Sequence, residues 1–112
     1  MKDCIVILDL GSEENERVLK DLQALGVDAQ IQKHTITLEE LQCIPNVKGI
    51  ILNGGPRGME NGQEWEAALE IYNCDIPALM VAHKGDAPWP EDPDIRDMVL
   101  RAFVFSICGI QE

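Results

Sequence analysis

The sequence has 112 residues, of which 46% are hydrophobic and 26% charged, so it is long enough for one compact domain over residues 1–112 and too short for two. Its 20 Asp and Glu residues outnumber 9 Lys and Arg residues, and the formal net charge is −11, whereas proteins that bind nucleic acid or anionic membranes carry positive surfaces. No apolar run reaches the roughly 18 residues that span a bilayer, and the first residues carry no signal-peptide pattern. We expect a soluble, cytoplasmic protein with no nucleic-acid or membrane partner.

The first half of the chain alternates apolar runs with amphipathic segments. The run over residues 4–10 predicts a strand buried on both faces, and the leucine-rich stripe after it predicts a helix over 12–26 with a serine N-cap. Residues 28–34 alternate in polarity, which is typical of an edge strand. A shorter helix is expected after an N-cap at Thr37, and residues 49–52 predict another buried strand.

The second half repeats this alternation. Residues 78–82 and 103–110 are continuous apolar runs and predict the fourth and fifth strands. Residues 85–93 contain three prolines and are expected to form a loop. Two further stripes have helical spacing, and we interpret both as core-facing. They are Trp65, Ala68, Leu69 and Tyr72, and Ile95, Met98, Val99 and Ala102.

Five strands separated by four helices form successive βαβ units, which predict an α/β fold with a parallel sheet covered on both faces. The commonest arrangement of this kind is the flavodoxin-like three-layer sandwich with a five-stranded sheet in the order 2-1-3-4-5. The fifth strand, Phe103–Ile110, then lies at a sheet edge. Because an apolar edge strand is a template for pairing, it is the expected surface for a protein partner or a homodimer.

Ligands of open α/β sheets bind beyond the carboxyl ends of the strands, where the strand order reverses. Two glycines directly after the third strand would allow backbone N–H groups to face a ligand, although such a pair also fits a turn with positive φ. Cationic residues after the third and fourth strands would create a positive spot for a small anionic ligand, or simply lie in solvated loops. The ligand-binding residues that we expect are Gly54, Gly55, Pro56, Arg57, His83 and Lys84.

Metal and cofactor sites have no support in the sequence. The cysteines are far apart, and most lie in apolar stretches, which indicates reduced, buried thiols and no metal cluster. No G-x-G-x-x-G fingerprint is present, and acidic residues in the first helical turn would repel a flavin phosphate. We therefore expect no cofactor. The four cysteines are Cys4, Cys43, Cys74 and Cys108.

Several segments resemble, in order and spacing, the class I glutamine amidotransferase family of the GMP synthase type. The resemblance covers about residues 4–81 and rests on D-L-G-S after the first strand, G-I-I-L-N-G-G-P at the end of the third, and I-P-A-L in the fourth. That family hydrolyses glutamine with a cysteine on an elbow after the I-P-x-L strand, assisted by a later H-x-E pair. Alignment on Ile76–Pro77 puts Ala82 at the nucleophile position, and neither His34 nor His83 has a glutamate two residues later.

The resemblance leaves two functions open. In the first, the chain is a non-catalytic domain of this family that binds a ligand or a partner, because a methyl group cannot form the thioester. In the second, it is an amidotransferase or glutaminase that acts with a partner chain or through Cys108, since residues 106–111 resemble the family's G-I-C-x-G-x-Q elbow with one residue missing. A structural module without a ligand is the third possibility.

Overall fold

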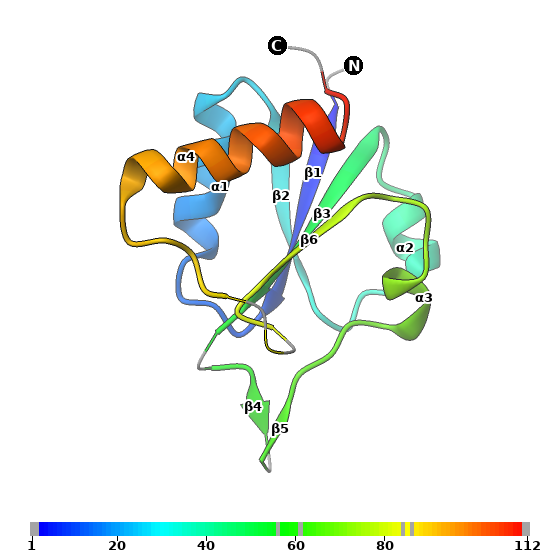
Figure 1. Cartoon of the computed structure of the whole chain (residues 1–112). Coiled ribbons are helices and arrows are strands. Elements are labelled where there is room, and N and C mark those ends of the chain that lie inside the picture. The colour runs from blue at the N-terminus through cyan, green and yellow to red at the C-terminus, as the bar shows by residue number, and fades with distance from the viewer. Residues whose placement is uncertain (1–2, 56, 61, 84, 86, 111–112) are drawn as a thin grey trace.

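The main sheet of the protein is parallel and lies between two layers of helices. The computed structural model describes residues 3–55, 57–60, 62–83, 85 and 87–110. In this part of the chain four strands lie side by side in the order β2-β1-β3-β6, and every neighbouring pair is parallel (Figure 1). The α/β class and the flavodoxin-like fold are thereby confirmed. The strands are β1 (Cys4–Leu10), β2 (Asp28–Lys33), β3 (Val47–Gly54) and β6 (Ala78–Val81).

Helices α1 and α4 cover one face of the sheet, and α2 and α3 cover the other. A small antiparallel hairpin of β4 (Met59–Glu60) and β5 (Gln63–Glu64) projects from the end of β3. The helices are α1 (Asn15–Ala24), α2 (Leu38–Gln42), α3 (Leu69–Tyr72), α4 (Pro93–Arg101) and a π-helical continuation of α4, η1 (Ala102–Ile107).

The start of α2 follows from local sequence. The hydroxyl of Thr37 accepts a hydrogen bond from the Glu40 amide at 3.1 Å, and the Glu40 carboxylate accepts one from the Thr37 amide at 3.0 Å. This capping box satisfies two backbone donors that the first turn leaves without partners, and it confirms the predicted N-cap.

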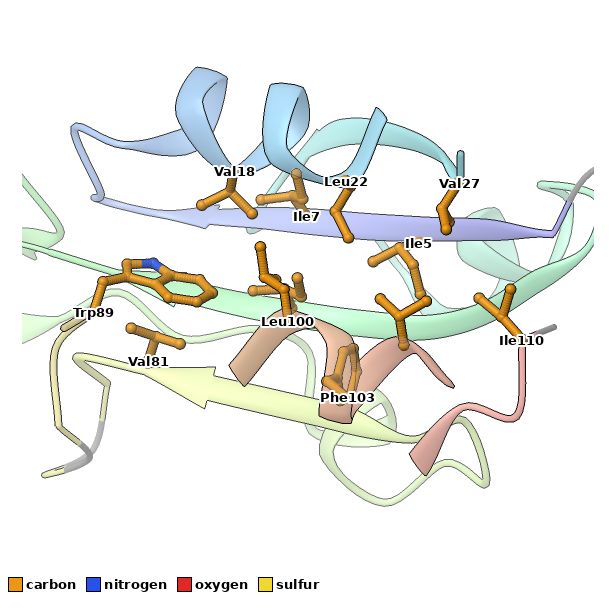
Figure 2. Close-up of a cluster of buried hydrophobic side chains, with 12 residues drawn as sticks. Ile5, Ile7, Val18, Leu22, Val27, Val81, Trp89, Leu100, Phe103 and Ile110 are labelled. Carbon is orange, nitrogen blue, oxygen red and sulfur yellow. The ribbon is translucent and has the colours of Figure 1, made fainter. Parts of the chain in front are cut away.

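The side chains of β1 divide between the two faces of the sheet. Ile5 and Ile7 pack with α1 and α4, whereas Val6 and Leu8 pack with α2 and α3, and all four are fully buried. Figure 2 shows the first of these clusters, where Phe103 lies against the sheet. Because both faces are covered, the strand reads as a continuous apolar run, as the sequence predicts.

The predicted fifth strand is wrong. Residues 103–107 continue the helix that begins at Pro93, and the helix ends near Gly109, whose φ is +71°. The Cys108 amide donates to the Phe103 carbonyl at 2.8 Å, which is the i to i−5 bond of a π-helix. A short apolar run does not by itself distinguish a strand from a buried helix, and here no glycine or proline interrupts the helix before residue 109. Because these residues are helical, the prediction of an edge-strand interface at Phe103–Ile110 is wrong as well.

The two predicted helical stripes face the core only in part: Trp65, Ala68 and Tyr72 of the first stripe and Val99 of the second pack against the core. Helix α3 is a single turn, and its Leu69 is 71% exposed. On α4 and η1 the core contacts come from Leu100, Phe103 and Val104, while Met98 is 66% exposed. Both sets on α4 have helical spacing, and the set with the larger side chains occupies the core.

The described residues include no helix long and apolar enough to cross a membrane and no group of three or more His, Cys, Asp or Glu side chains placed to hold a metal ion. The four cysteines are free thiols. Cys4 is buried, but Cys43 is exposed, contrary to the expectation that the thiols are buried.

Candidate functional site

The loops at the carboxyl ends of β1, β3 and β6 meet in direct backbone contact. A Cβ atom added to Gly55 would lie 2.7 Å from the Gly11 carbonyl oxygen, and one added to Gly54 would lie 2.8 Å from the Ala82 carbonyl carbon. Neither Gly54 nor Gly55 has a left-handed φ, which contradicts the alternative that the pair forms a turn with positive φ. Both residues are glycine because three loops cross here without room for a side chain.

Two shallow hollows flank this crossing and share Ser12 and Glu13. The first has a volume of about 210 Å³, which is below the roughly 300 Å³ at which drug-sized pockets begin, and the second about 240 Å³. The first is lined by Ser12, Glu13, Glu14, Gly54, Gly55, Ala82, Pro88 and Trp89, and the second by Asp9, Ser12, Glu13, Asn15, Glu16, Ile31 and Arg57.

A larger hollow of about 440 Å³ lies at the other end of β1 and β2, beside Cys4 and Asp28. The two smaller hollows are the better candidates for a ligand site, because ligands of open α/β sheets bind at the carboxyl ends of the strands.

Ala82 forms a strained elbow directly after β6. Its φ is +49°, a left-handed conformation that costs an L-amino acid with a Cβ about 1–2 kcal/mol. The amide of Ala82 donates to the Ala87 carbonyl at 2.9 Å, which closes the turn behind the elbow. Ala82 is one of the residues that line the first hollow, and its methyl side chain offers no nucleophile.

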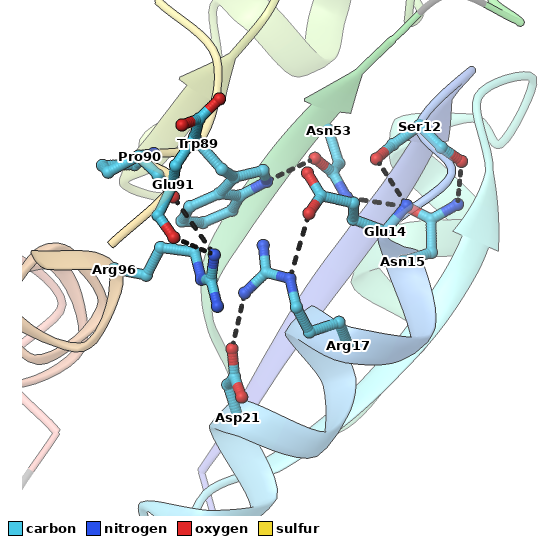
Figure 3. A network of polar contacts seen from close by, with 10 residues as sticks. All are labelled: Ser12, Glu14, Asn15, Arg17, Asp21, Asn53, Trp89, Pro90, Glu91 and Arg96. Atoms are coloured by element: carbon cyan, nitrogen blue, oxygen red, sulfur yellow. Dashed lines mark hydrogen bonds and ion pairs between the residues drawn. The ribbon is translucent and has the colours of Figure 1, made fainter. Parts of the chain in front are cut away.

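A buried polar network lies beside the first hollow, and Figure 3 shows its hydrogen bonds. The indole Nε1 of Trp89 donates to Asn53 Oδ1 at 2.9 Å, and Asn53 Nδ2 donates to Asn15 Oδ1 at 2.8 Å. Asn15 Nδ2 in turn donates to the Ser12 carbonyl at 3.3 Å. Asn53 is fully buried, so these bonds satisfy an amide that would otherwise destabilise the fold. The sequence signal for this network is Asn53, a polar residue at the end of the apolar run of β3.

The side chain of Arg17 packs on the outer face of the Trp89 indole ring. Its guanidinium lies 5.4 Å from the centre of the indole ring and also contacts Glu14 at 3.2 Å and Asp21 at 2.7 Å. The loop that contains Trp89 is therefore fixed to α1 as well as to β3 (Figure 3).

The expected positive spot does not form among the described residues. His83 is only 1% exposed, its Nε2 lies 2.7 Å from the Tyr72 hydroxyl, and it lines neither hollow. Arg57 lines the second hollow, where its Nη2 donates to the Ser12 carbonyl at 2.7 Å. Lys84 and Pro56, which were also expected to bind ligand, lie outside the described residues.

Cys108 lies near the start of β3, far from the two hollows at the carboxyl end of that strand. A Cβ added to Gly49, five residues before Gly54, would be 2.5 Å from the Cys108 sulfur. Burial raises the pKa of the Cys108 thiol from 9.0 to about 11, which favours the protonated form. A nucleophilic cysteine needs the opposite shift.

The comparisons with known proteins agree on one family. The model of the class I glutamine amidotransferases matches residues 6–82. A protein named as a second glutamine-hydrolyzing GMP synthase of Bacteroides thetaiotaomicron is 38% identical over 113 residues, covering 96% of this chain and 26% of the relative. Glutamine-hydrolyzing GMP synthase of Bacillus subtilis is 32% identical over 83 residues, covering 74% of this chain and 16% of the relative. The chain thus spans about a quarter or less of these relatives.

Proposed function

Because this chain belongs to the class I glutamine amidotransferase family, with a domain of the GMP synthase type, we propose that it is a non-catalytic member that acts by binding. The observation that carries the proposal is the residue at the elbow after β6. The backbone there is left-handed, with φ +49°, but the residue is Ala82, which has no atom that can attack an amide carbon.

The other groups that could supply the chemistry support the same proposal. The Cys108 thiol is at the opposite end of β3 and has a raised pKa. His83 is buried against Tyr72, and His34 stacks on Trp65 with ring centres 4.3 Å apart. Neither histidine lines the hollow beside Ala82.

We propose a single domain over residues 1–112 whose ligand occupies the first hollow, above Gly54 and Gly55 and beside Trp89. Glu13 and Glu14 border this hollow, so a neutral or zwitterionic ligand is favoured over the small anion expected from sequence. The relatives are named glutamine-hydrolyzing, and glutamine is therefore the first ligand to test.

An ammonia-release assay with glutamine tests the loss of catalysis. The purified chain should release no ammonia above background, with or without an added GMP synthase lacking its own amidotransferase domain. Ala82→Cys should not restore activity, because neither His34 nor His83 lines the hollow beside it. Ammonia release that disappears in Cys108→Ser would overturn the proposal in favour of an active amidotransferase.

Calorimetric titration with glutamine and glutamate tests the binding role. We expect glutamine to bind and Glu14→Gln to change its affinity, while Glu39→Gln, a remote exposed carboxylate on α2, leaves the affinity unchanged. If neither amino acid binds, the hollow is not a glutamine site.

A further inference from the structure

Helix α4 presents a second apolar side to solvent. Met98 is 66% exposed and Ile95 is 47% exposed, although both have the helical spacing of a core stripe. The opposite side of the same helix, which includes Leu100, is buried against the sheet. We call the exposed side the α4 stripe, and it consists of Ile95, Met98 and Ala102.

Exposed apolar side chains concentrate on this helix. Five large hydrophobic side chains are exposed among the described residues, and three of the five belong to α4 and η1. Scattered single apolar residues are normal on a protein surface, but a contiguous stripe indicates an interaction surface. The five are Leu69, Met80, Ile95, Met98 and Ile107.

Charged residues border the α4 stripe in a polarised order. Asp94, Asp97 and Arg101 follow one another at helical spacing along one border, and Arg101 Nε lies 2.7 Å from Asp97 Oδ2. The border is therefore acidic toward the start of the helix and basic at its end. The only other charged neighbour in the middle of the helix is Arg96, which donates to the carbonyls of the preceding loop.

We infer that the α4 stripe is the contact surface of a homodimer, in which α4 packs antiparallel against α4 of a second copy. A two-fold axis beside Met98 brings Ile95 of each copy opposite Ala102 of the other. The same axis puts Arg101 of one copy across from Asp94 and Asp97 of the other, so opposite charges meet on the border.

The order of charges along the border indicates that the partner of the α4 stripe is a second copy of this chain. The net charge of −11 on each copy opposes self-association at long range, where salt screens it, whereas on the inverted border Arg101 of one copy lies beside Asp97 of the other at short range. Antiparallel packing also sets the positive end of one helix dipole beside the negative end of the other. One helix face buries less than the roughly 800 Å² per partner of a standard interface, so the dimer is weak and reversible.

Sedimentation velocity from about 5 to about 500 µM, a span suited to micromolar affinity, tests the homodimer. The wild-type chain should shift from monomer to dimer, and Met98→Lys should weaken the association by about tenfold or more. Leu69→Lys is the matched control, since it adds the same charge at an equally exposed leucine outside the stripe. A wild-type chain that stays monomeric, or an equal loss in both variants, would overturn the inference.

Disulfide trapping tests the antiparallel geometry and needs no equilibrium constant. In a Cys43→Ser background, which removes the exposed thiol, Met98→Cys should cross-link two copies rapidly under mild oxidation. Ile95→Cys should cross-link slowly, because residue 95 faces residue 102 of the other copy. Equal rates at both positions indicate parallel packing and contradict the inference, as does the absence of cross-linking. Far-UV circular dichroism verifies that each variant remains folded.

Discussion

Replacing Gly49 with alanine should destabilise the protein through a contact between β3 and the end of η1. The new Cβ would lie 2.5 Å from the Cys108 sulfur, 2.9 Å from Ile5 Cδ1 and 3.1 Å from Phe103 Cζ. Favourable contacts need about 3.5–4.0 Å, so the sulfur must move by about 1 Å. Such overpacking costs about 1–3 kcal/mol of unfolding free energy.

A double-mutant cycle measured by urea unfolding tests whether the Cys108 sulfur causes this loss of stability. Cys108→Ala removes the sulfur, so the combined variant should lose about 1–2 kcal/mol less stability than the sum of the two single changes. Gly26→Ala, at a glycine with no atom within 4 Å of the added Cβ, should show no such coupling with Cys108→Ala. Additivity of the Gly49 and Cys108 changes within about 0.5 kcal/mol would refute the packing of residue 108 against β3.

Three further outcomes are expected. Gly54→Ala forces a Cβ against the backbone of the β6 elbow and should lower the unfolding free energy by about 2–3 kcal/mol in urea denaturation; a neutral effect would show that the elbow moves freely. The raised pKa of Cys108, about 11 against 9.0 in the unfolded chain, means that the folded state retains its proton longer, so stability should fall between pH 9 and 11. Thermal unfolding across this range should show a smaller decline in Cys108→Ala. Trp89→Phe removes the donor to a buried amide oxygen and should cost about 1–3 kcal/mol. Trp65→Phe is its control in the same denaturation assay, because the Trp65 Nε1 makes no hydrogen bond within the described residues, and an equal cost would contradict the role of the network.

The sheet could be predicted from sequence because its strands are buried on both faces. Burial of this kind requires apolar side chains at every position, and β1 is found at its predicted limits, Cys4–Leu10. The region after Pro93 could not be predicted as reliably. It contains two apolar stripes at helical spacing and an apolar run, and only the contact with β3 decides that Phe103 and not Met98 faces the core.

The site was predictable in part. Strand ends and glycine pairs indicate where three loops meet, and the resemblance to the family singles out Ala82. The reason for the glycines was not predictable, because it depends on how closely the loops of β1 and β3 approach each other. The bond between Trp89 and Asn53 joins residues 36 positions apart, which no local pattern reports.

The left-handed conformation of Ala82 means that the scaffold, and not a reactive side chain, dictates the direction in which residue 82 leaves the sheet. The pairing of Asn53 with Val81 and the bond from the Ala82 amide to Ala87 hold that direction on both sides. Any amino acid introduced at position 82 therefore leaves the backbone at the point where Ala82 borders the first hollow. For protein engineering, position 82 is thus a point at which side-chain chemistry can be added and its contribution measured apart from that of the backbone.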